Sequence, residues 1–233
     1  VRAVFCARGG YGVQRILAGL DSSLLRADPK IICGFSDVTA LLCWVLAQGV
    51  VPFHGPVVTQ LGKLPPADLE HLFAVLENPE HAVTLQGSPL PGATGTVEGA
   101  LVGGNLSLLA ALAGTPWAPA LADRLLLLEE VGEQPYRVDR LLTTLLHQVD
   151  ERSAARAAGY AVGELRACTP GTRGGPSALG VVAERLAGHG RAFVSALPFG
   201  HGERNAAIPL GVRARLDPVR GTLSWEGGAV ARH

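Results

Sequence analysis

The stretch "KIICGFSDVTALL", residues 30–42, decides the fold class of this chain. Lys30 to Phe35 predicts a buried strand, and Asp37 to Ala47 predicts a helix that is apolar on nearly every side. A strand that turns directly into a helix is the building unit of α/β proteins. The turn places Ser36 at the start of the helix, where its hydroxyl is either a helix cap or an exposed nucleophile.

The neighbouring segments continue this alternation. "VRAVFC" (1–6) predicts a strand, "ARGGYG" (7–12) a glycine-rich turn, and a helix is expected to begin near Val13. Pro66 opens an amphipathic helix that runs to about Glu77. We therefore expect residues 1–80 to form a parallel-sheet α/β domain. Because the chain opens directly on a strand, we expect the first elements of this domain to be missing here.

The amino-acid composition changes from Ala82 onward, where glycine, proline and threonine become frequent. We expect residues 81–233 to form a second, β-rich α/β domain. Its predicted helices cover about 105–113, 136–149 and 178–186. Its predicted strands are short ones after Ala82, then 124–130, one within 154–165, 191–199, and antiparallel strands in the tail.

Composition excludes several classes of function. Of 233 residues, 48% are apolar and 17% are charged, which indicates a globular chain. Lys plus Arg equals Asp plus Glu at 20 each, so the charge gives no case for nucleic acid or an anionic membrane as partner. No apolar run reaches the roughly 18–20 residues that span a bilayer. The four cysteines lack metal-type spacing, and we expect reduced, buried thiols, a cytoplasmic location and no metal or cofactor.

Three residues are candidates for chemistry, each with a plainer alternative. Ser36 follows a tight turn that resembles the G-x-S-x-G elbow but lacks its second glycine; the alternative is an N-cap. Glu129 and Glu130 end the apolar run "LLLLEE", and adjacent strand residues face opposite sides, so at most one faces a given pocket. The alternative is that both are solvated. His201 lies in a glycine-flanked loop, where a lone histidine is usually just solvated.

Together these residues supply a nucleophile, a carboxylate and an imidazole in the order Ser, Glu, His. A serine hydroxyl needs a hydrogen-bonded imidazole to take its proton, and the imidazole needs a carboxylate to orient it. The glycine turn "ARGGYG" is either an ordinary turn or a source of backbone N–H groups aimed at developing negative charge.

Four blocks of sequence carry a resemblance to a known family. They are "ARGGYGVQRIL", "PKIICGFSDVTALL", "GTVEGALVGGNLSLLAALAGTPWAP" with "LLLLEEVGEQPYRVDRLL", and "PFGHGERNAAIPLG". In combination they resemble the LD-carboxypeptidase family of serine peptidases, which includes muramoyltetrapeptide carboxypeptidase and the microcin C self-immunity hydrolases. Family members form homodimers, use no metal, and pair an α/β domain with a β-rich one.

The resemblance implies a catalytic triad of Ser36, Glu129 and His201. It implies oxyanion donors at the backbone of Asp37 and in the glycine turn, where we select Gly10. The expected reaction is hydrolysis of the LD-amide bond that releases terminal D-alanine from cytoplasmic murein tetrapeptide during cell-wall recycling.

We assign substrate binding to Arg8, because a buried carboxylate needs a charged partner, and to Asn105. Two alternatives stay open. One is a related hydrolase of peptidyl-nucleotide antibiotics, for which Trp117 is the candidate stacking residue. The other is a catalytically silent muropeptide-binding remnant.

Overall fold

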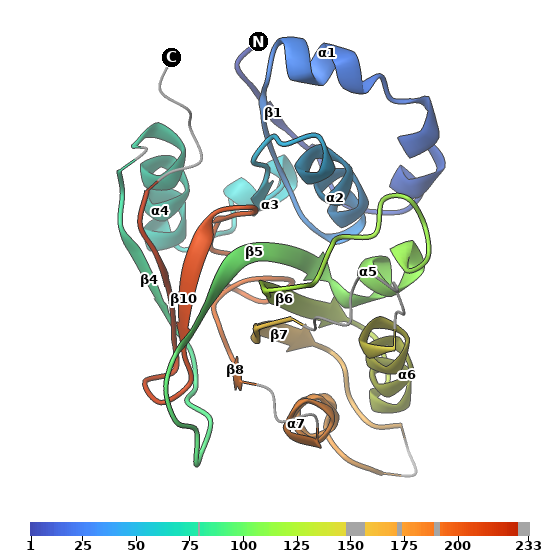
Figure 1. Cartoon of the computed structure of the whole chain (residues 1–233), viewed down its shortest axis with the longest axis vertical. Coiled ribbons are helices and arrows are strands. Elements are labelled where there is room, and N and C mark those ends of the chain that lie inside the picture. Colours follow the sequence, from blue (N-terminus) through green and yellow to red (C-terminus); the bar gives the residue numbers. More distant parts are fainter. Residues whose placement is uncertain (79, 148–156, 172–173, 189–191, 228–233) are drawn as a thin grey trace.

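A computed structural model describes residues 1–78, 80–147, 157–171, 174–188 and 192–227. Within these ranges the strands form two sheets, one of four strands and one of seven, with helices packed around them (Figure 1). The predicted α/β class is confirmed. None of the helices in these ranges is both long enough and apolar enough to cross a bilayer.

The four-stranded sheet has the order β1-β2-β3-β9. The first three strands pair in parallel, and the last pairs antiparallel to β3. The strands are β1 (Ala3–Phe5), β2 (Ile31–Gly34), β3 (Phe53–His54) and β9 (Ile208–Pro209). The first sheet is thus completed by a strand from the last quarter of the chain.

Of the helices beside this sheet, the sequence predicts those at Thr39–Ala47 and Pro66–Glu77 but not the two shorter ones. The helices are α1 (Ser22–Ala27), α2 (Thr39–Ala47), α3 (Val58–Leu61) and α4 (Pro66–Glu77). The helix expected from Val13 is wrong: two short 3-10 turns, Val13–Arg15 and Leu17–Gly19, stand in its place. Leu20 is extended, because Asp21 caps α1 by accepting the Ser23 N–H, so no longer helix can run through this point.

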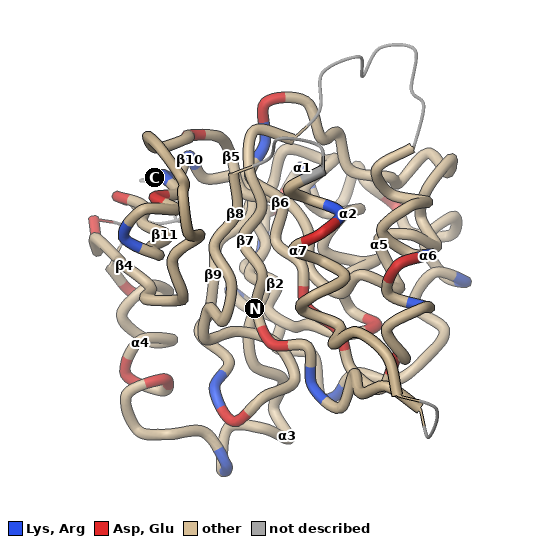
Figure 2. Tube along the Cα trace, turned by 90° about the horizontal axis from the view of Figure 1, so that it is seen from below, with Lys and Arg blue, Asp and Glu red and all other residues tan. Residues whose placement is uncertain are grey.

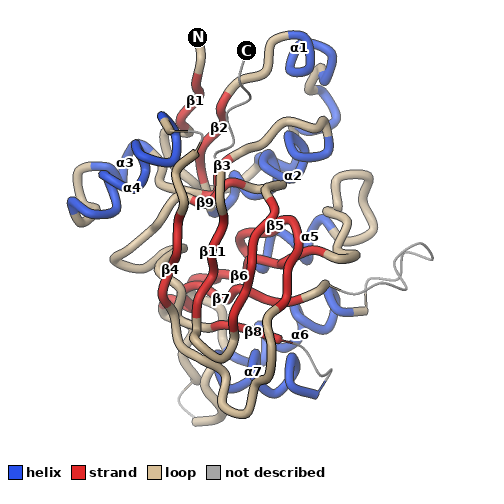
Figure 3. Tube along the Cα trace, turned by 60° about the vertical axis from the view of Figure 1, so that its left-hand side comes forward, coloured by secondary structure: helices blue, strands red, loops and turns tan. Residues whose placement is uncertain are grey.

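The seven-stranded sheet has the order β4-β11-β10-β5-β6-β7-β8. Its first four strands pair antiparallel, as the tail sequence predicts, and β5 to β8 pair in parallel. Helices α5, α6 and α7 pack beside the parallel half (Figures 1 and 3). The strands are β4 (Val83–Gln86), β5 (Val97–Asn105), β6 (Arg124–Val131), β7 (Gly159–Arg166), β8 (Ala192–Val194), β10 (Arg213–Asp217) and β11 (Thr222–Trp225). The helices are α5 (Leu106–Leu112), α6 (Pro135–Leu146) and α7 (Ala178–Gly188).

Three predicted elements of this part reach beyond the described ranges. The end of the helix predicted to Val149 and the beginning of the strand predicted from 154 fall on residues 148–156, and Arg191 begins the strand predicted over 191–199. The described parts of these elements are α6, β7 and β8, so their type agrees with the sequence pattern.

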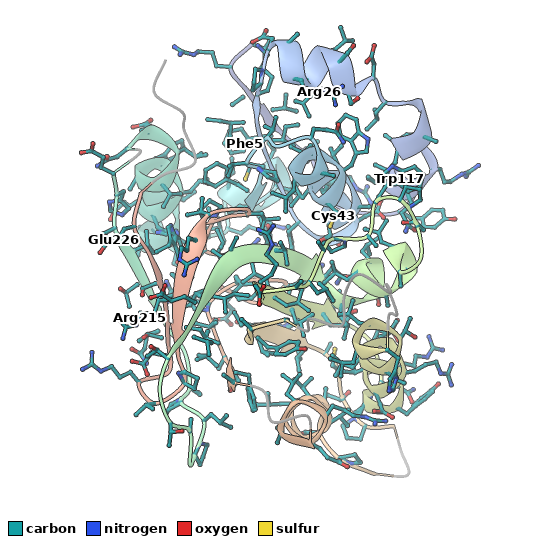
Figure 4. All side chains as sticks on the ribbon, viewed as in Figure 1. Phe5, Arg26, Cys43, Trp117, Arg215 and Glu226 are labelled. Atoms are coloured by element: carbon teal, nitrogen blue, oxygen red, sulfur yellow. The ribbon has the colours of Figure 1, made fainter. Side chains whose placement is uncertain are left out.

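The core runs through both sheets. The four leucines of β6, Leu125 to Leu128, are each at most 2% exposed, and α2 is buried on most sides. Cys43 lies within this packed interior, whereas Arg215 and Glu226 are exposed on the antiparallel half of the large sheet (Figure 4). Charged residues of both signs are scattered along the chain (Figure 2).

Candidate active site

Ser36 stands in the turn between β2 and α2 with a backbone φ of 64°, in the left-handed region that non-glycine residues rarely adopt. Such a conformation costs about 1–3 kcal/mol and persists only where the surroundings fix it. Gly34 makes the tight turn feasible, since a Cβ atom there would lie 2.8 Å from Val38 Cγ1.

The Ser36 hydroxyl does not cap a helix. The 3-10 turn Ser36–Val38 has Phe35 at its N-cap, α2 has Val38, and neither helix start has a side-chain cap. The Ser36 Oγ atom lies 3.1 Å from His201 Nε2 instead. The N-cap alternative is therefore wrong for this serine.

His201 joins Ser36 to Glu129. Its Nδ1 atom lies 2.6 Å from Glu129 Oε2, which fixes the proton on Nδ1 and leaves Nε2 free to accept from the Ser36 O–H. The imidazole is 17% exposed, and the Phe35 ring packs against it with centroids 4.6 Å apart. The loop histidine is thus partly buried and held on both nitrogens, so the alternative of a merely solvated histidine is wrong.

Glu129 and Glu130 are both buried, so the alternative of solvated strand-end charges is wrong. Burial raises the pKa of Glu129, while the hydrogen bond and charge of His201 oppose that rise. Glu129 Oε1 is buried and has no hydrogen-bond partner among the described residues. The 2.6 Å contact with His201 therefore orients this carboxylate, and the Asn105 side chain acts with His201 in lowering the pKa of Glu129.

The Glu130 carboxylate forms hydrogen bonds with residues other than His201, as strand alternation predicts. Its carboxylate accepts from Asn105 Nδ2 at 3.0 Å, from the N–H and hydroxyl of Ser107 at 2.8 and 2.6 Å, and from the Val131 N–H at 2.8 Å. Four donors satisfy this buried charge. They tie the end of β6 to the start of α5.

The glycine turn brings Gly9 to Ser36. A Cβ atom on Gly9 would lie 2.9 Å from Ser36 Cβ, whereas the nearest neighbour of one on Gly10 is the Arg8 guanidinium at 3.8 Å. Arg8 Nε donates to the Gly9 carbonyl at 3.1 Å, and Arg8 itself is exposed. The turn thus adjoins the serine, with Gly9 as the residue in contact.

Asp37 and Asn105 use their side chains inside the protein. Asp37 accepts the Val13 N–H at 3.0 Å, which ties the first 3-10 turn to the serine turn. Asn105 Oδ1 accepts from Leu108 N–H at 3.2 Å as the cap of α5, and its Nδ2 donates to Glu130. Its backbone pairs with that of Glu129. The structure therefore places Asn105 beside the carboxylates with its amide already occupied.

Sequence reasoning missed His54, which lies at the end of β3. Its ring is fully buried and packs edge-on against Phe35 and Phe199, with centroids 6.0 and 5.4 Å apart. Neither ring nitrogen has a partner among the described residues. Burial, with a smaller effect from His201, lowers the pKa of His54 to about 3, so its ring is neutral. The motif "PFHGP", an apolar run with a central histidine, was the available signal.

Three of the four cysteines are buried, as the sequence predicts, and Cys6 is only partly buried. All four thiols are free, and burial raises the pKa of Cys33 and of Cys43 to about 12, which makes them poor nucleophiles. Within the described ranges, no group of three or more His, Cys, Asp or Glu side chains is placed to hold a metal ion.

Known proteins are similar to this chain in sequence and in fold. The family model of the LD-carboxypeptidase N-terminal domain matches residues 1–55, and that of the C-terminal domain matches residues 98–216. The murein tetrapeptide carboxypeptidase of Pseudomonas aeruginosa is 37% identical over 97% of this chain and 75% of its own length. The crystal structure of muramoyltetrapeptide carboxypeptidase from Oxalobacter formigenes superposes with a TM-score of 0.84 at 31% identity, covering 98% of this chain and 79% of that one.

A more distant relative bears on the alternative function. The microcin C7 self-immunity protein MccF of Escherichia coli is 26% identical over 93% of this chain and 71% of its own length. The family models cover most of the chain, and the Pseudomonas relative is well above 30% identical over nearly all of it. The chain therefore belongs to the LD-carboxypeptidase family of serine peptidases.

Proposed function

We propose that this protein is a serine carboxypeptidase that hydrolyses an LD-amide bond and releases terminal D-alanine from murein tetrapeptide. One observation carries the proposal: Ser36, His201 and Glu129 form an unbroken chain of hydrogen bonds of 3.1 and 2.6 Å. The Pseudomonas relative, named for its action on murein tetrapeptide, supports the substrate class.

In this mechanism Ser36 Oγ attacks the peptide carbonyl while its proton passes to His201 Nε2. The carbon–nitrogen bond then breaks, and the same proton leaves with the amine of D-alanine. Water, activated by His201, hydrolyses the resulting ester and restores Ser36. Glu129 keeps the imidazole in the correct tautomer and stabilises its charged form.

The backbone around Ser36 supports an oxyanion site. The first N–H groups of a helix have no intrahelical partner, and the Asp37 amide stands at such a position, at the start of the 3-10 turn, where it can donate to an oxyanion. The Asp37 side chain is already bound to Val13 and leaves this role to the backbone. The second predicted donor is the Gly10 amide, and the contact of Gly9 with Ser36 supports a donor from the same turn.

We assign the substrate's terminal carboxylate to Arg8, whose exposed guanidinium lies beside the glycine turn. Asn105 remains the second proposed substrate residue, and it would have to share or exchange a hydrogen bond that it now gives to Glu130. The proposal also includes a cytoplasmic setting in cell-wall recycling, a homodimer, and a domain division near residue 80 that separates Ser36 from Glu129 and His201.

Two alternatives are weaker. Hydrolysis of a peptidyl nucleotide rests on the similarity to the microcin C7 self-immunity protein and on Trp117, which is partly buried in the loop after α5 (Figure 4). A silent muropeptide-binding protein would have no use for a hydrogen-bonded serine, imidazole and carboxylate.

The deciding experiment incubates the purified protein with murein tetrapeptide, with a second LD-amide, with a DD-amide control and with a peptidyl nucleotide. We expect D-alanine to be released from the tetrapeptide and the DD-amide to stay intact. Cleavage of the peptidyl nucleotide alone would move the function to the first alternative. Binding of the tetrapeptide without any cleavage would move it to the second.

A further inference from the structure

The loop that carries His201 has no regular secondary structure, yet it holds the imidazole on two partners at once. The loop is closed at its base, where the Ala206 N–H donates to the Pro198 carbonyl at 2.8 Å. Inside it, the Gly200 N–H donates to Asn205 Oδ1 at 3.0 Å. The buried side chain of Asn205 therefore holds the residue that precedes His201.

Asn205 is fixed at both ends of its amide. Its Nδ2 donates to Gln60 Oε1 at 3.2 Å, and the same Gln60 oxygen accepts from the Val57 N–H at 3.3 Å. Because Nδ2 is engaged in this way, Oδ1 is the atom left to face Gly200. Asn205 is fully buried, so water does not compete for these contacts.

Asn205 is held in turn by Asp68, which lies in the first turn of α4. Asp68 Oδ2 accepts from the Asn205 N–H at 3.0 Å, and Oδ1 accepts from Arg204 Nε and Nη2 at 3.0 and 2.6 Å. The carboxylate is fully buried although its arginine partner is about half exposed. A buried charge is costly unless it is paired. The hydrogen bonds that this carboxylate makes with the described residues come from Arg204 and Asn205, both in the His201 loop.

The loop leaves little room for movement at its other side. Gly200 has a φ of 111°, and a Cβ atom on it would lie 2.9 Å from both Cβ and Oε2 of Glu129. The Gly200 backbone is thus pressed against the carboxylate that meets His201. A shift at Asn205 would move Gly200 and change both contacts of the imidazole.

We propose that Asp68 is a positioning residue for His201, acting through Asn205 and Gly200. It links α4 to a loop 136 residues further along the chain and sets the distances from the imidazole to Ser36 and Glu129. This inference rests on the proposed serine-peptidase function. Asp68 touches none of the reacting groups, so its effect is on geometry and not on the chemistry itself.

The test compares Asp68→Asn and Asn205→Ala with Glu70→Gln, a control that neutralises an exposed carboxylate on the same helix. In Asp68→Asn, an NH₂ group replaces one carboxylate oxygen and faces a donor, either Arg204 or the Asn205 N–H, with which it cannot form a hydrogen bond. We expect kcat for D-alanine release to fall roughly tenfold to a hundredfold while KM changes little, because a misplacement of about 1 Å has that effect. Glu70→Gln should match the wild type in both.

A second measurement needs no substrate. We expect the His201 Nδ1 proton, which lies between His201 and Glu129, to give a low-field NMR signal that is absent in His201→Gln. We expect this signal to move or broaden in Asp68→Asn and in Asn205→Ala, and to stay in place in Glu70→Gln. If the wild type releases no D-alanine, the proposed function fails, and the NMR comparison still decides the positioning claim.

The opposite result is equally clear. Should Asp68→Asn lower the melting temperature but keep the wild-type kcat and the wild-type Nδ1 signal, Asp68 would be a structural anchor only, and the inference would be overturned. If Asp68→Asn does not fold, Asn205→Ala decides by the same two measurements, because it leaves Asp68 paired with Arg204.

Discussion

Gly9 lies against Ser36 so closely that no methyl group fits between them. A Cβ atom added to Gly9 would come within 2.9 Å of Ser36 Cβ and 3.0 Å of Ser36 Oγ. Real Cβ contacts are almost never that short. The glycine turn and the strained serine turn therefore fit closely together. The position of the Ser36 hydroxyl depends on the absence of a side chain at Gly9, within "ARGGYG".

Gly9→Ala should accordingly displace the Ser36 side chain. We expect kcat to fall roughly tenfold to a hundredfold and the free energy of unfolding to drop by about 1–3 kcal/mol, the usual cost of overpacking. Gly62→Ala is the matched control, since Gly62 has a φ of −78° and open space where its Cβ would stand. Equal activity of the two variants would show that Ser36 tolerates a shifted neighbour.

Ser36→Ala and His201→Ala should each reduce turnover by about a thousandfold or more, as in other serine triads. The two losses should not add in the double variant, because both residues serve the same proton transfer. D-alanine release measures the activity, and circular dichroism checks the fold. If Ser36→Ala kept more than about a tenth of wild-type turnover, a residue other than Ser36 would be the nucleophile.

The regular elements could be predicted because their signals are local. Ile31–Gly34 is an unbroken apolar run, and α4 begins at Pro66 and ends at Glu77 as the proline and the apolar spacing predict. The helix expected from Val13 failed because Asp21 starts a new helix immediately after it, which a periodicity argument does not detect. Local capping outweighed the apolar pattern there.

The site could be predicted only as far as its motifs reach. The sequence contexts make Ser36, His201 and the pair of glutamates candidates, and the family resemblance selects Glu129 from that pair. The structure brings the side chains of Ser36, Glu129 and His201 together. Asp68 gave no signal, because an aspartate in the first turn of a helix is commonplace. Its contact with Asn205 joins residues 137 apart in the chain, and such contacts follow from packing alone.

Metal chelators should leave the activity unchanged. A serine hydroxyl activated by an imidazole and a carboxylate needs no ion to generate the nucleophile. The measurement is D-alanine release before and after prolonged treatment with EDTA, with a zinc-dependent peptidase treated in parallel. A loss that added zinc restores would contradict the proposed mechanism.

His54 should make the fold less stable in acid. Its pKa in the folded protein is about 3, below its ordinary value of 6.5. Between these two pH values the unfolded chain binds a proton at His54 and the folded protein does not. The stability that the neutral His54 allows is therefore fully present above pH 6.5 and is lost as the pH falls from 6.5 towards 3. The slope is at most about 1.4 kcal/mol per pH unit.

His54→Phe removes this titration and keeps a ring between Phe35 and Phe199. We expect its free energy of unfolding, measured with urea, to fall less than that of the wild type as the pH is lowered from 6.5. The raised pKa of Glu129 acts with the opposite sign, but it is present in both proteins, so the difference between them reports His54. Parallel curves for the two proteins would mean that the buried ring is reached by water.

Glu129 and Glu130 provide the riskiest prediction, because they are adjacent and both buried. Glu129→Gln keeps a hydrogen-bonding group beside His201 Nδ1 but removes the charge that stabilises the imidazolium. The comparable change in the serine protease triad costs about four orders of magnitude in kcat. We expect a smaller loss, on the order of a hundredfold, because the longer glutamine side chain has more rotamers with which to reach the ring.

Glu130→Gln should act on stability instead. The Glu130 carboxylate is the acceptor in all four of its hydrogen bonds. The NH₂ group of a glutamine would therefore face at least one donor with which it cannot bond. A buried donor or acceptor left without a partner costs about 1–3 kcal/mol, and we expect a loss of stability of that size with turnover within a few-fold of the wild type. Both variants are measured on one substrate, with urea unfolding alongside. If Glu130→Gln cripples turnover while Glu129→Gln is mild, Glu130 is the carboxylate that serves His201 during the reaction, and the assignment of the triad must be exchanged.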